Sequence, residues 1–140
     1  MSSMLIRAEI SEKNRYWIDK HRHYELKHFC LQYPSWKRSY EECNDSIIFA
    51  SSIENTSSSG MTSDLTAKHA IKKAQYAGRI KMIEDAANKT DEFLSDYILK
   101  AVTEGLSYTY LKSKLNIPCG RDLYYERYRR FFWILNGLRD

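Results

Sequence analysis

The residues whose types could support chemistry lie in two places. His21, Glu25 and His28 are spaced by four and three positions, so on a helix they would share one side, where a metal ion could bind. Surface histidines without a metal are far commoner, so no metal site and no cofactor are expected. The chain also has no GxSxG motif, and its five glycines are too scattered for a phosphate-binding loop. We therefore do not expect an enzyme.

The second place is the last third of the chain, where positive charge accumulates. The net charge is +4, but residues 106–139 alone carry seven basic residues against two acidic ones, a local charge of +5. Residues 44–64 contain no Lys or Arg and three acids. A local basic excess of this kind favours double-stranded DNA as the partner. The seven basic residues are Lys112, Lys114, Arg121, Arg127, Arg129, Arg130 and Arg139.

Two helices are expected to position these charges, over 107–115 and 121–137, with a turn over 116–120 between them. A short helix, a tight turn and a second helix that begins with a basic residue form a helix-turn-helix. The second helix carries an apolar stripe spaced 4, 3, 4 and 3, which predicts its buried side. The stripe consists of Tyr124, Tyr128, Phe131, Leu135 and Leu138.

The opposite side of this helix would then face DNA. Arg121 and Tyr125, near its start, are expected to reach base edges or phosphates, while lysines on the preceding helix hold the flanking backbone. The alternative is a helical hairpin whose basic residues are only solvated. Arg127 and Arg130 are expected to be structural, pairing with Asp96 or Glu104. The complete predicted DNA-binding set is Arg121, Tyr125, Arg129, Lys112, Lys114, Asp122 and Glu126.

The remaining pattern predicts an all-α protein, a helical bundle with this module at its C-terminus. Residues 1–43 form an N-terminal helical region, with one helix over 11–32 whose cap region is Ser11 with Asn14, and a short second helix after Tyr33-Pro34 that runs through Cys43. Residues 44–63 form a polar linker or loop. Residues 64–90 form a long helix capped by Asp64, and 91–140 form the DNA-binding region. A helix over 91–103, closed by Gly105, would turn Phe93, Leu94, Tyr97, Ile98 and Ala101 inward.

The long helix is apolar on two sides, which is typical of a helix packed between partners. One side carries Ala67, Ile71, Ala74, Gly78 and Met82, and the other Tyr76, Ile80, Ile83 and Ala87. The first side could pack within the molecule, or it could form a homodimer through the 64–88 helix. Three widely separated cysteines suggest free thiols, and no signal peptide or membrane span is apparent, so a cytoplasmic protein is expected.

The segment TDEFLSDYILKAVTEGLSYTYLKSKLNIPCGRDLYYERYRRFFWIL resembles the C-terminal half of the ArpU/RinA group of phage late-gene transcription regulators. In that group a helix-turn-helix is similar to sigma-factor region 4. The resemblance implies that Leu111, Leu115, Ile117 and Tyr124 are core residues. It also implies a phage or prophage regulator that binds promoter DNA, with RNA polymerase as a further partner.

A different class of function stays open at this point. A small terminase subunit for DNA packaging, or a phage inhibitor of a host protein, would also be a helical interaction module. A two-sided long helix would suit either of these roles.

Overall fold

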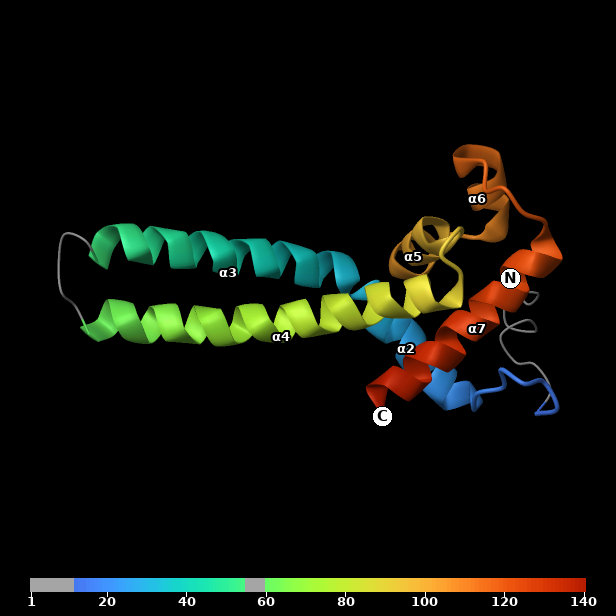
Figure 1. Cartoon of the computed structure of the whole chain (residues 1–140), viewed down its shortest axis with the longest axis horizontal. Helices are drawn as coiled ribbons and strands as arrows, with labels where there is room; N and C mark the ends of the chain where they lie inside the picture. The colour runs from blue at the N-terminus through green and yellow to red at the C-terminus, as the bar shows by residue number, and fades with distance from the viewer. Residues whose placement is uncertain (1–11, 55–59) are drawn as a thin grey trace. The chain divides into compact units, whose positions relative to one another are not determined.

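The computed structural model describes residues 12–54 and 60–140, and all regular secondary structure within them is helical (Figure 1). The all-α prediction is therefore confirmed. The described residues divide into two compact units, one formed by 12–32 with 82–140 and the other by 33–81. The helices are α2 (Lys20–Leu31), α3 (Tyr33–Glu54), α4 (Gly60–Thr90), α5 (Ser95–Glu104), α6 (Tyr108–Leu115) and α7 (Arg121–Arg139).

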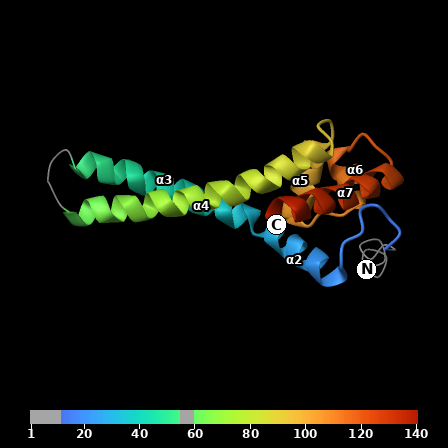
Figure 2. The same cartoon turned by 60° about the horizontal axis from the view of Figure 1, so that its bottom comes forward.

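The first unit is built on α2, α5 and α7, which pack on one another (Figure 2). Each supplies side chains with no exposed surface, among them Leu26, Ile98, Phe131 and Leu135. Burying a side chain of this kind stabilises a fold by about 1.5–3 kcal/mol. The predicted stripe of α7 does lie in this core, with Tyr124, Phe131 and Leu135 buried and Tyr128 and Leu138 half-buried.

The end of α5 and both ends of α6 lie where the sequence signals predict them, but α5 begins at Ser95, four residues later than predicted. Oδ1 of Asp91 accepts hydrogen bonds from the backbone N–H of Phe93 (2.9 Å) and Leu94 (3.0 Å), which orders the turn before α5. Gly105 ends α5 with φ +70°, a left-handed conformation that glycine adopts without strain. Ser107 then caps α6, its Oγ accepting from the N–H of Tyr110. The prediction that Phe93 points inward is wrong, since it is 77% exposed in the turn.

The N-terminal helix is shorter than predicted, because it begins at Lys20 and not near residue 11. Ser11 lies outside the described residues. Oδ1 of Asn14 accepts from the N–H of Tyr16 and its carbonyl from Trp17, so residues 14–17 form a turn, and Asp19 caps the helix by accepting from the N–H of His21.

The second unit is a helical hairpin in which α3 and residues 60–81 of α4 run antiparallel side by side (Figures 1 and 2). Buried residues recur every seven positions along α3, at Trp36, Cys43 and Ala50. This is the period of two helices that wind around each other. Lys73 crosses the seam, donating from Nζ to Oδ1 of Asn44 (2.7 Å), and Arg79 stacks on the Trp36 ring.

Two predictions about this region are wrong. Residues 44–54 belong to α3 and 60–63 to α4, so the polar linker over 44–63 is helical at both ends; residues 55–59 lie outside the described part. Asp64 is not an N-cap, because α4 begins at Gly60. The two apolar sides predicted for α4 differ in their packing within the chain. Ile80, Ile83 and Ala87 are buried, whereas Ala67, Ile71, Ala74 and Gly78 are exposed.

Candidate nucleic-acid interface

The segment from α6 to α7 is held in place by one tyrosine and one left-handed residue. The Tyr108 hydroxyl donates to the carbonyl oxygen of Cys119 (2.7 Å), tying the start of α6 to the end of the connection. Asn116 (φ +55°) ends α6, and the N–H of Ile117 donates to the carbonyl oxygen of Leu111 (3.0 Å). Ile117 and Leu111 are buried, so residues 116–120 have a fixed path into α7.

The first turn of α7 offers backbone donors to solvent. Its N-cap is Gly120, which has no side chain to accept a hydrogen bond from the turn. The first N–H groups of a helix lack partners within the helix and carry the positive end of its dipole, which together attract anions. Sequence reasoning missed this feature, although a glycine at an N-cap in a basic segment could have signalled it.

Arg121 stands beside this turn and is exposed. Its guanidinium carbon lies 5.0 Å from the centre of the Tyr108 ring, a cation–π contact that orients it without neutralising its charge. Burial raises the pKa of the Cys119 thiol, and the positive charge of Lys112 opposes that rise in part. The structure thus brings Arg121 and Lys112 to the same connection.

Other predicted DNA contacts are placed differently. Lys114 is exposed, but it follows Lys112 by two residues, about 200° around the helix, and leaves α6 on another side. Asp122 is exposed in the first turn of α7, where its charge opposes that of a phosphate. Glu126 is half-buried and paired with Arg127.

Tyr125 and Arg129 do not present the exposed surface that was predicted. Tyr125 is only 6% exposed, since its ring packs against Tyr124 (5.1 Å between centroids) and Tyr128 (6.1 Å). Arg129 is half-buried, and its Nε is fully buried with no hydrogen-bond partner among the described residues. The buried arc of α7 is wider than its 4-3-4-3 stripe, which explains both errors.

Arg127 is structural, as predicted, but its partner is Asp91 and not Asp96 or Glu104. Glu104 pairs with Lys100 along α5. Arg130 is half-buried and makes no ion pair with a described carboxylate, so the pairing predicted for it is wrong.

The histidine positions on α2 form no metal site. His21, Glu25 and His28 are all exposed, and in the described part of the chain no three His, Cys, Asp or Glu side chains are grouped to hold a metal. The three cysteines are free thiols, and burial raises the pKa of Cys30 far above its usual range. None of the described helices is both long and apolar enough to span a membrane.

Comparison of the chain with known proteins returns no matching family model, no matching curated protein and no matching solved structure.

Proposed function

We propose that the protein binds double-stranded DNA through the start of α7 and the connection that precedes it, in the manner of a helix-turn-helix. The observation that carries the proposal is the exposed Arg121 at an α7 N-terminus whose cap, Gly120, has no side chain to occupy the backbone donors; Lys112 adds positive charge at Cys119 in the same connection. Two cations and a helix N-terminus together make a site for a phosphate group.

The placement of side chains also favours one mode of contact. Tyr125 is buried and therefore cannot reach a base. Arg121 is then the side chain on α7 that is left to meet a guanine edge in the major groove. Lys112 would contact the flanking phosphates, which positions the protein without reading sequence. We propose, on the resemblance to the ArpU/RinA group, that this binding regulates phage late-gene promoters and that RNA polymerase is a second partner.

Binding to fluorescent duplexes from the region of the protein's own gene, titrated with salt, tests the proposal. The logarithm of affinity should fall with the logarithm of salt concentration, with a slope of about −0.9 per phosphate neutralised. Lys112→Gln should make the slope shallower by about 0.9, the contribution of one phosphate contact. Lys89→Gln, which removes an exposed lysine at the end of α4, is the matched control and should leave it unchanged. Absence of binding, or equal slopes for both variants, would refute the proposal.

The exposed side of α4 supports a second candidate, a role in self-association. Ile71 is 61% exposed, and a Cβ added at Gly78 would meet no atom within 4 Å, so a second helix could approach closely there. A homodimer through the 64–88 helix would cover this side. Sedimentation of the protein and of Ile71→Lys tests this: a dimer that the substitution dissociates supports it. A ring of many subunits would favour a role in DNA packaging. A protein that stays monomeric at all concentrations would exclude both the homodimer and the ring.

A further inference from the structure

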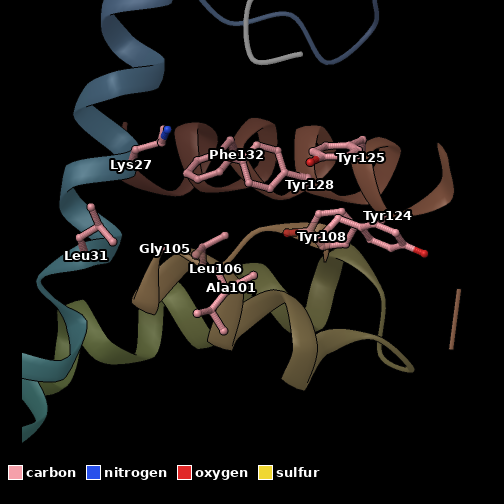
Figure 3. Close-up of a pocket in the computed structure, with 11 residues that line it drawn as sticks. Lys27, Leu31, Ala101, Gly105, Leu106, Tyr108, Tyr124, Tyr125, Tyr128 and Phe132 are labelled. Carbon is pink, nitrogen blue, oxygen red and sulfur yellow. The ribbon is translucent and has the colours of Figure 1, made fainter. Parts of the chain in front are cut away.

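A cavity of about 160 Å³, partly open to solvent, is formed in the first unit by α2, the end of α5 and α7. Figure 3 shows its walls: Lys27 and Leu31 reach in from α2, Leu106 from the segment after α5, and Tyr125, Tyr128 and Phe132 from α7. All of these residues belong to the same compact unit. The cavity is therefore formed by the packing of that unit alone.

The walls are largely apolar, and five of the eleven lining residues are aromatic. The Tyr128 ring meets Phe132 edge-on at 5.0 Å between centroids and Tyr125 at 6.1 Å. Aromatic rings prefer such edge-on or offset partners, so a further ring could enter the cluster in the same geometry. An apolar cavity of about 150 Å³ in another protein stays dry and binds benzene, which sets the size of ligand that fits here at about one ring.

Charge at the cavity comes from a single side chain. Lys27 is the one charged residue among those that line it. Its Nζ lies 5.9 Å from the centre of the Tyr24 ring, and within the described chain no carboxylate pairs with it. The site thus offers one unpaired cation beside an aromatic wall.

We propose that this cavity binds a small aromatic carboxylate, with its ring among Tyr125, Tyr128 and Phe132 and its carboxylate at Lys27. The apolar walls would supply most of the affinity and the lysine the preference for an anion. This proposal does not rest on DNA binding. Arg121 and Lys112 do not line the cavity, although Tyr108, on whose ring Arg121 lies, does.

Benzoate and its neutral relative benzyl alcohol are suitable probes, titrated into the whole protein and followed by amide chemical shifts in NMR spectra. Ligands of about nine heavy atoms that fit well should bind with a Kd of about 1 mM. Benzoate should bind about five- to tenfold more tightly than benzyl alcohol, the effect of one partly exposed charge pair. The shifts should centre on Leu106, Tyr125 and Phe132.

Variants separate the ring site from the charge. Lys27→Gln should remove the preference for benzoate, and Lys27→Arg should restore it. Lys37→Gln is the matched control, because Lys37 also lies over a tyrosine ring, that of Tyr33, at 5.8 Å but does not line the cavity. Ala101→Leu, which fills the cavity from α5, should abolish binding of both probes while the amide spectrum stays folded. Should that variant unfold, Leu106→Phe fills the same space from a less buried position.

The proposal is overturned if neither probe shifts these amides at about 10 mM, roughly ten times the expected Kd. It is also overturned if Lys27→Gln and Lys37→Gln change the preference for benzoate equally. Failure of the DNA-binding experiment would leave these outcomes unaffected, since the probes are titrated without DNA.

Discussion

Nε of Arg127 donates a 2.8 Å hydrogen bond to Oδ2 of Asp91, joining residues 36 positions apart. The same carboxylate accepts two backbone hydrogen bonds through Oδ1 at the turn before α5. One side chain, only 17% exposed, thereby fixes the start of α5 to the middle of α7. Because the proposed DNA-binding surface lies at the start of α7, Asp91 helps to hold that surface in place through Arg127.

The first prediction is that stability depends on pH through Asp91. Partial burial raises the pKa of this carboxyl, but the hydrogen bonds from Arg127, Leu94 and Phe93 outweigh burial and hold it below its usual value. A carboxyl with a depressed folded pKa stabilises the fold above its unfolded pKa, about 3.9, and loses that stabilisation as pH falls through the folded value. The free energy of unfolding should therefore decline below about pH 4.

Urea unfolding of Asp91→Asn at pH 7 and pH 3 measures this contribution. Asparagine still accepts from the backbone through its amide oxygen but cannot pair with Arg127, so stability at pH 7 should fall by about 1–2 kcal/mol. The difference from the unmodified protein should shrink at pH 3. Glu92→Gln, at the exposed neighbouring position, is the control. An Asp91→Asn effect that is the same at both pH values would contradict the assignment.

The second prediction concerns Arg22, which joins α2 to the C-terminal end of α7 by hydrogen bonds. Its Nε donates to Oδ1 of Asn136 (2.6 Å) and its Nη2 to Oδ1 of Asp140 (2.8 Å), and it also pairs with Glu25. Lysine lacks the planar fork that serves several acceptors, so Arg22→Lys should lower stability by about 1 kcal/mol. In urea unfolding, Arg22→Lys and Asn136→Ala should together cost less than the sum of their separate effects. Strict additivity would mean that the two side chains do not cooperate in solution.

Signals that act within a few residues allowed much of this fold to be predicted. The end of α5 at Gly105 and the start of α6 near Ser107 depend on local backbone chemistry, and both were predicted correctly. The extent of α3 was not, because the serines and asparagine after Cys43 favour turns in isolation. There the recurrence of Trp36, Cys43 and Ala50 against α4 outweighs that local preference.

The candidate site was predicted only in part, for a related reason. The 4-3-4-3 stripe of α7 gives the centre of its buried side but not the width. Tyr125 lies about 100° from Tyr124 on the helix. It is buried because α6 packs there too, with Tyr108 at 6.5 Å between ring centroids. A contact of this kind depends on the tertiary arrangement, which periodicity along one helix does not encode.

The third prediction compares two glycines. Gly105 has φ +70°, so Gly105→Ala should destabilise the protein by about 1 kcal/mol through backbone strain. Crowding contributes little, since the added Cβ would meet Leu31 at an ordinary 3.6 Å. Gly78→Ala, in the middle of α4 with no atom within 4 Å of the new Cβ, should stabilise α4 by about 0.5–1 kcal/mol. Thermal unfolding of the two variants should shift in opposite directions, and shifts of the same sign would argue against the left-handed stop.

The last prediction separates the surface from the core of α7. Tyr125→Ala removes a ring packed between Tyr124 and Tyr128 and should cost about 3–5 kcal/mol of stability. Tyr125→Phe keeps that ring and should cost about 1 kcal/mol or less. Arg121→Ala loses only an exposed cation–π contact with Tyr108, about 0.5–1 kcal/mol, yet should weaken DNA binding by about 1–3 kcal/mol.

Urea unfolding and duplex binding, measured on the same preparations, distinguish these effects. Any DNA-binding loss in Tyr125→Phe should be small, because a residue that is 6% exposed cannot reach a base edge. If Tyr125→Phe lost binding while remaining folded and Arg121→Ala kept it, the tyrosine would have to leave the core on contact with DNA. The side of α7 that meets DNA would then be the one that is buried in the free protein, contrary to the surface proposed from Arg121 and Lys112.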